Sequence, residues 1–164
     1  MQWELITDII LISSILTLVA FFCLGVYQWI TRGSIKQVDK QLRWMPLPVA
    51  LMAIIYVVFD YLIILNHRPN GSGEPSFPST HVMVVTTIFF ITTIILPKYV
   101  KNKTLRIVLE SIMVILISLT CMGRVYANMH WIVDVIGGLA FGFVFSEIYY
   151  LIIKKKKKYG KHIQ

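Results

Sequence analysis

Apolar residues are gathered along the chain into five long runs that are separated by short polar connections. The runs cover about residues 5–30, 47–65, 79–96, 105–122 and 131–153. Most of them approach the roughly 20 residues that a helix needs to cross the hydrocarbon core of a bilayer. Backbone polar groups in lipid must be satisfied within the segment, so each run is predicted to be a helix. The pattern therefore predicts an all-α protein, a polytopic bundle of about five transmembrane helices.

The composition supports this prediction and indicates one membrane domain, residues 1–164. Of the 164 residues, 57% are hydrophobic and only 15% are charged, whereas about a quarter of an ordinary soluble domain is charged. The first run is too long for the hydrophobic region of a signal peptide and no basic segment precedes it, so we expect it to be retained as a span. Asp60 and Glu147 lie inside apolar runs and are expected to face protein rather than lipid.

Lysines and arginines predict the orientation of these helices. Fourteen of the sixteen lie between the first and second runs, between the third and fourth runs, or after the fifth. Short basic connections remain in the cytoplasm, so the N-terminus is predicted outside and the C-terminus inside the cell membrane. The basic tail, residues 154–164, is then expected to lie against the anionic lipids of the inner leaflet. Because the net charge of +8 is divided among these connections, a nucleic-acid partner is not expected.

The first outer connection is rich in glycine and proline and leads into the third run. It carries Arg68 and ends in the segment Pro78-Ser79-Thr80-His81. Ser79 is a natural helix N-cap, and Val82 in place of Glu or Gln at the third helical position rules out a capping box. Some N–H groups of the first helical turn therefore stay available, and a free helix N-terminus binds anions.

The second outer connection carries Arg124, His130 and Asp134. His130 and Asp134 are four residues apart, so they lie on one face if the last helix has already begun there. The carboxylate can then hold one imidazole nitrogen and leave the other free to react. Guanidinium groups bind phosphate oxygens bidentately, and two histidines suit a nucleophile and a general acid. A mutually satisfied structural pair is the simpler alternative for His130 and Asp134.

Three ordered motifs in these connections resemble the signature of the type 2 phosphatidic acid phosphatase superfamily. They are Arg68-Pro69, Pro78-Ser79-Thr80-His81 and Arg124-x5-His130-x3-Asp134. Each motif is weak alone, but the three in order at the membrane edge are specific. The resemblance implies a metal-independent phosphatase without cofactors, which hydrolyses a lipid phosphate or diphosphate on the extracytoplasmic side.

The resemblance also implies a role for each motif residue. His130 would attack phosphorus and form a phosphohistidine, Asp134 would orient His130, and His81 would protonate the leaving lipid oxygen. The phosphoryl oxygens would be held by Arg68, Arg124, Ser79 and the backbone N–H groups that begin at Thr80. Phosphatidic acid, phosphatidylglycerophosphate and an isoprenyl diphosphate all fit as the lipid substrate.

Four features depart from the family pattern. The lysine usually found seven residues before the first arginine is replaced by Tyr61, so one phosphate contact is missing or is supplied differently. Thr80 stands where glycine is usual, and Gly123 stands where serine is usual. Members commonly have six spans rather than five, and a homo-oligomer would cover the side that a missing helix leaves open.

Two other interpretations remain open. A non-catalytic lipid-phosphate binding or transport protein would keep the anion site without turnover, and Tyr61 is its best support. A zinc site could be built from His67, His81, His130 and Asp134, since four such ligands suit zinc, although no His-Glu-x-x-His motif is present. Phosphate release in the presence of a chelator would distinguish the three interpretations.

The predicted orientation can be tested with single cysteines in a variant that lacks Cys23 and Cys121. Ser72→Cys should react with a membrane-impermeant thiol reagent in intact cells, because the motif-bearing connection is expected outside. Asn102→Cys, in a basic connection, should react only after the cells are lysed. The reverse labelling pattern would contradict the orientation.

Overall fold

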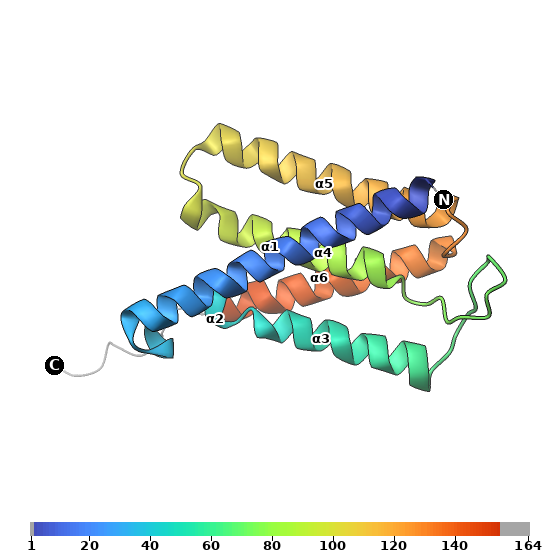
Figure 1. Cartoon of the computed structure of the whole chain (residues 1–164), viewed down its shortest axis with the longest axis horizontal. Coiled ribbons are helices and arrows are strands. Elements are labelled where there is room, and N and C mark those ends of the chain that lie inside the picture. Colours follow the sequence, from blue (N-terminus) through green and yellow to red (C-terminus); the bar gives the residue numbers. More distant parts are fainter. Residues whose placement is uncertain (1, 155–164) are drawn as a thin grey trace.

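The computed structural model describes residues 2–154, and the predicted basic tail lies outside these residues except for Lys154. Every regular element in this part of the chain is helical (Figure 1). The long helices are α1 (Gln2–Arg32), α3 (Pro46–Val57), α4 (Thr80–Tyr99), α5 (Lys103–Tyr126) and α6 (Ile132–Lys154). Shorter turns precede and extend α3: η1 (Ile35–Gln37), α2 (Lys40–Arg43) and the π-helical turn η2 (Val58–Leu62).

Five helical segments are long and apolar enough to cross a membrane, which confirms the predicted number of spans. Helix α4 forms the core of the bundle. In Figure 1, α1 crosses in front of α4 and α6, while α5 and α3 flank them on opposite sides. In α4, 56% of the span is buried inside the protein, against 28% or less in any other span. The apolar side chains exposed on the other spans are therefore available for contact with lipid.

Two glycines bring α6 close to α4. A Cβ atom at Gly138 would lie 2.7 Å from the carbonyl oxygen of Ser79, and one at Gly142 would lie 2.7 Å from the Cβ of Thr86. Small residues allow helix backbones to approach each other in a membrane, where packing rather than the exclusion of water drives helix association. The start of α4 is therefore held directly against the start of α6.

A polar cluster around Asp39 ties α1 to α4 at the other end of the bundle. Its carboxylate accepts hydrogen bonds from Gln28 at 2.9 Å and from Tyr99 at 3.0 Å, and it pairs with Lys98 at 2.7 Å. Burial disfavours the charged form of Asp39, but these donors outweigh burial and hold its pKa well below the ordinary range. The cluster joins the two basic connections of the chain.

The motif-bearing connections, residues 63–79 and 127–131, lie at the end of the bundle that also holds the N-terminus (Figure 1). The basic connections lie at the opposite end. The basic connections are thus grouped at one end of the bundle and the motif-bearing connections at the other, as the predicted orientation requires. Which end faces the outside of the cell stays a prediction.

The helix ends lie within a few residues of the predicted spans, and three of them shape the connections that carry the motifs. The second span ends in the π turn at Leu62, and the next four residues, 63–66, are not helical. Helix α5 continues past Arg124, so this arginine belongs to the last helical turn and not to the connection. Helix α6 begins at Ile132, so His130 precedes the helix. The last two differences change the geometry of the site.

The two carboxylates inside the apolar runs have different surroundings. Asp60 is half-buried in the π turn, as expected for a residue that faces protein. Glu147 is exposed on the surface of α6, and the expectation that it faces protein is wrong. The reason is that α6 turns the face with Gly138 and Gly142 toward α4, and Glu147 lies on a different face of the helix.

The close approach of α4 and α6 can be tested with Gly138→Ala. The added methyl group would meet backbone atoms of α4, which cannot move aside cheaply, and overpacking of this kind costs about 1–3 kcal/mol. The thermal unfolding midpoint in detergent should therefore fall. Gly25→Ala is the matched control, because its nearest neighbour, Cβ of Leu42, would lie at an ordinary 3.6 Å. Equal midpoints for the two variants would contradict the packing argument.

Candidate active site

Hydrogen bonds join the two motif-bearing connections into one site. The backbone N–H of Ser79 donates to the carbonyl oxygen of Asp134 at 2.9 Å. The indole N–H of Trp131 donates to the carbonyl oxygen of His67, also at 2.9 Å. The two segments are far apart in sequence, and these contacts place their motif residues around the start of α4, the end of α5 and the start of α6.

The loop that carries Arg68 folds back on itself and fixes this side chain. The backbone N–H of Arg68 donates to the carbonyl oxygen of Glu74 at 3.0 Å, and its Nε atom donates to the carbonyl oxygen of Pro75 at 3.4 Å. Its Nη1 atom lies 2.7 Å from the carboxylate of Glu74. The side chain of Arg68 is 23% exposed, so part of the guanidinium remains accessible to a ligand.

The imidazole of His130 is buried and held through one nitrogen. Its Nδ1 atom lies 2.9 Å from the backbone carbonyl oxygen of Ser76. A carbonyl oxygen can only accept a hydrogen bond, so Nδ1 must carry the proton. The Nε2 atom of the neutral ring then has a free lone pair, which is the form that a nucleophile requires.

The carboxylate of Asp134 does not hold this nitrogen directly, which differs from the expected arrangement. Its Oδ2 atom lies 3.8 Å from Nδ1 of His130, accepts a hydrogen bond from the N–H of Trp131 at 2.8 Å and accepts another from the hydroxyl of Ser76. The reason is that α6 begins at Ile132, so the i, i+4 geometry of a helix does not apply to His130. Ser76 therefore stands between the two residues.

Ser76 is a site residue that the sequence argument did not identify. It is buried, and it contacts both His130 and Asp134. Its only sequence signal is its position two residues before Pro78 in the structured loop. This signal does not distinguish Ser76 from the other polar residues of the loop.

The surroundings of His130 favour its neutral form. Burial, followed by the positive charges of Arg124 and Arg68, lowers the pKa of His130 to about 4. The carbonyl oxygen of Ser76 and the carboxylate of Asp134 act in the opposite direction but do not outweigh them. The ring is therefore unprotonated at neutral pH.

Unpartnered polar groups surround the start of α4. The first helical hydrogen bond runs from the N–H of Met83 to Ser79, so the N–H groups of Thr80, His81 and Val82 lack partners among the described residues. The hydroxyl of Ser79 and the Nε atom of Arg124 are buried and also lack partners in this part of the chain. Buried donors without partners are costly, and together they form a site suited to an anion.

Helix α1 adds two residues to the site that the sequence argument also missed. Oδ1 of Asp8 lies 2.9 Å from Nε2 of His81 and 3.5 Å from Nη1 of Arg124. Thr7 accepts a hydrogen bond from the same Nη1 atom at 3.4 Å. An acidic residue near the N-terminal end of the first span was visible in the sequence, but nothing there indicated that α1 packs beside α4 and α5.

The structure therefore brings all seven predicted site residues to one end of the bundle, around the start of α4. They are His81, His130, Asp134, Arg68, Arg124, Ser79 and Thr80.

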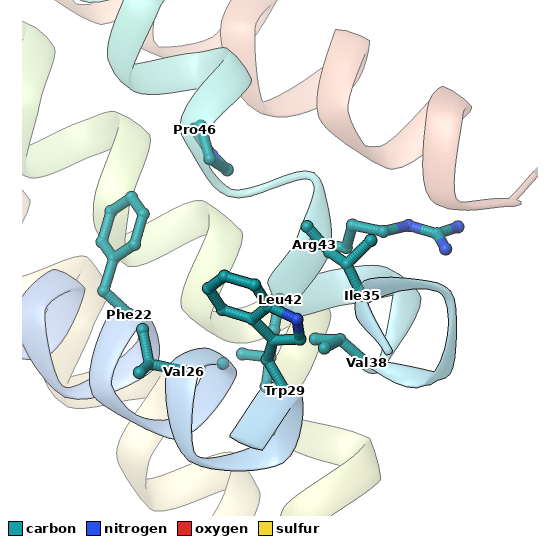
Figure 2. Close-up of a pocket in the computed structure, with 9 residues that line it drawn as sticks. Phe22, Val26, Trp29, Ile35, Val38, Leu42, Arg43 and Pro46 are labelled. Atoms are coloured by element: carbon teal, nitrogen blue, oxygen red, sulfur yellow. The ribbon is translucent and has the colours of Figure 1, made fainter. Parts of the chain in front are cut away.

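A different hollow, of about 130 Å³, lies at the opposite end among α1, η1, α2 and the start of α3 (Figure 2). It is lined mainly by apolar side chains, including Phe22, Trp29 and Leu42, and is not continuous with the polar site.

The protein has five apolar spans, and at one end of the bundle two histidines and two arginines lie around a helix N-terminus with unpaired N–H groups. These features define a multi-pass membrane protein with a phosphatase-type site. The chain belongs to the PAP2 superfamily, whose family model matches residues 56–158. Among solved structures, it is similar to a transmembrane PAP2-type phosphatidylglycerolphosphate phosphatase from Bacillus subtilis. That match has a TM-score of 0.69 and 18% sequence identity, and it covers 97% of this chain and 80% of the other. No curated protein matches the chain.

The lowered pKa of His130 predicts how stability depends on pH. The folded-state pKa of about 4 lies below the ordinary value of 6.5, so the contribution of a neutral His130 is complete above about pH 6.5 and is lost as the pH falls toward 4. His130→Gln, which cannot be protonated, should lose less stability over this interval. Thermal unfolding in detergent across this pH range would measure the difference. A parallel loss of stability in both proteins would contradict the assignment.

Proposed function

We propose that the protein is a metal-independent lipid phosphatase that acts at the extracytoplasmic face through a phosphohistidine intermediate. The observation that carries this proposal is the hydrogen bond from Nδ1 of His130 to the carbonyl oxygen of Ser76. It leaves the Nε2 lone pair free on a ring that lies within the field of Arg124 and Arg68. Family membership supports phosphatase chemistry in general, and this geometry supports His130 as its nucleophile.

In the proposed first step, Nε2 of His130 attacks phosphorus and the bond from phosphorus to the lipid oxygen breaks. Arg68, Arg124 and the N–H groups at the start of α4 stabilise the charge on the phosphoryl oxygens. His81 gives a proton to the lipid oxygen as it leaves. Asp134 orients His130 with the help of Ser76 and stabilises the positive ring.

In the proposed second step, water attacks the phosphohistidine and inorganic phosphate is released. His81, which has lost its proton to the lipid, accepts a proton from this water. His130 returns to its neutral form, which burial and the neighbouring arginines favour. The cycle requires one neutral and one protonated histidine at the start, so activity should decline on both the acidic and the alkaline side.

The substrate is proposed to be a lipid whose phosphate lies at the depth of the outer helix ends. Phosphatidic acid, phosphatidylglycerophosphate and an isoprenyl diphosphate all meet this requirement. The similarity to a phosphatidylglycerolphosphate phosphatase supports the second of these as the first compound to test.

A lipid-phosphate binding or transport protein without turnover is the second candidate function. It is favoured by Tyr61, which stands at the usual lysine position and is 70% exposed. Its ring packs edge-on against Tyr56, with centroids 6.1 Å apart, so no cation is supplied at this point. A binding protein could tolerate this loss more easily than an enzyme that must stabilise a transition state.

Replacement of His130 separates catalysis from binding. Purified His130→Ala in detergent should lose phosphate release by several orders of magnitude, because the nucleophile is gone. Binding of inorganic phosphate, measured by isothermal titration calorimetry, should persist because Arg68 and Arg124 remain. His67→Ala, which removes an exposed histidine of the same loop, is the matched control and should retain activity.

The assay should contain the three lipids, each with and without excess chelator. Near-normal phosphate release by His130→Ala would contradict the mechanism. Activity that disappears in chelator and returns with zinc would contradict metal independence. If the wild-type protein binds a lipid phosphate but releases no phosphate from any of the three lipids, the binding function is supported instead.

A further inference from the structure

Helix α1 brings a negative charge into the site from outside the segment that the family model matches. That segment covers residues 56–158 and does not include α1. Asp8 lies 2.9 Å from His81 and 3.5 Å from Arg124 through the same carboxylate oxygen, Oδ1. The three family motifs do not account for this charge, so its effect on the reaction is a separate question.

The helical turn that carries Asp8 is held in place by the preceding residue, Thr7. Thr7 is fully buried, and a Cβ atom at Gly123 would lie 2.5 Å from its methyl carbon. Its hydroxyl also accepts the hydrogen bond from Arg124. The backbone at Asp8 is therefore fixed against α5, while its side chain, 47% exposed, stands at the mouth of the site.

Acidic partners already offset the positive charge of the site. Arg68 pairs with Glu74 at 2.7 Å, and Arg124 pairs with Asp8. Tyr61 supplies no cation where the family usually has a lysine. Among the described residues, this end of the bundle offers no lysine, and its two arginines each have a carboxylate beside them. The site is therefore poorly equipped for a substrate with many negative charges.

Monophosphate and diphosphate esters differ in the group that leaves beside His81. The lipid oxygen of a monophosphate becomes a neutral hydroxyl when it receives the proton from His81. The leaving group of a diphosphate is itself a lipid phosphate, which keeps negative charge on its oxygens next to Asp8. Like charges so close together are unfavourable, and more so where little water screens them.

We propose that Asp8 is a specificity-determining residue that makes this site select lipid monophosphates over lipid diphosphates. The inference rests on the proposed function, in which His81 lies on the leaving-group side, and deepens it by naming the substrate class. The carboxylate acts in two ways. It balances the charge of a protonated His81, and it repels the second phosphate of a diphosphate.

The test compares kcat/KM for phosphatidic acid and for farnesyl diphosphate in the same detergent micelles. The wild-type protein should prefer phosphatidic acid, and Asp8→Asn should reduce this preference roughly tenfold by removing the like charge while keeping the shape. The ratio of two substrates on one preparation cancels any loss of folded protein. Glu4→Gln is the matched control: it removes the same charge one helical turn away. Glu4 acts on Arg124 through space less strongly than Asp8 does, and among the described residues it forms no ion pair with Arg124 or His81.

Each outcome decides between the two proposals. If both substrates are hydrolysed and Asp8→Asn leaves the ratio unchanged, or Glu4→Gln changes it equally, the specificity role of Asp8 is wrong and the phosphatase function stands. If the wild-type protein hydrolyses neither of these substrates and releases no phosphate from phosphatidylglycerophosphate either, the proposed function is wrong. The role of Asp8 can then still be tested by measuring anion binding with isothermal titration calorimetry. Asp8→Asn should gain more affinity for pyrophosphate than for inorganic phosphate. Equal gains for the two anions would overturn the inference.

Discussion

The site depends on the close approach of two helix backbones, those of α4 and α6. The absence of a side chain at Gly138 lets α6 lie against the carbonyl group of Ser79, which is the N-cap of α4. The same approach lets the N–H of Ser79 donate to the backbone of Asp134. One contact thus positions both the helix N-terminus and the carboxylate that supports His130. No hydrophobic force draws helices together in lipid, so this proximity has to be encoded by small residues.

The electrostatics of the site follow from its place at the membrane edge. Arg68 and Arg124 each lie beside a carboxylate, because an isolated charge that is removed from water is costly. The compensation is incomplete, since the Nε atom of Arg124 and the hydroxyl of Ser79 have no partner in the described part of the chain. Donors held in advance in this way stabilise developing negative charge without rearranging during a reaction. The stability lost to unpaired donors is thus consistent with a site built for an anion.

The spans and the motif residues could be predicted from the sequence because both are local properties. A run of apolar residues defines a span by its length alone. The three ordered motifs identify His81 and His130 from the sequence without knowledge of how the chain folds. The contacts of Ser76 and Asp8 could not be predicted, because they depend on the path of a loop and on which helix α1 packs against. The direct contact expected between His130 and Asp134 assumed that α6 had already begun at His130. Helix ends shift by a few residues when tertiary contacts intervene, and here that shift placed Ser76 between them.

Two of the departures from the family pattern, those at Gly123 and Tyr61, bear on the charge at the same end of the bundle. Gly123, in place of the usual serine, makes room for Thr7, whose hydroxyl then contacts Arg124. The turn that delivers Thr7 also delivers Asp8 and its negative charge. Tyr61, in place of the usual lysine, removes a positive charge at another point of the same end of the bundle. Each change taken alone is small, but together they leave a site in which α1 replaces a lost hydroxyl and lowers the net positive charge. Under the proposed specificity, the number of negative charges that a ligand can carry depends on the first helix as much as on the motifs.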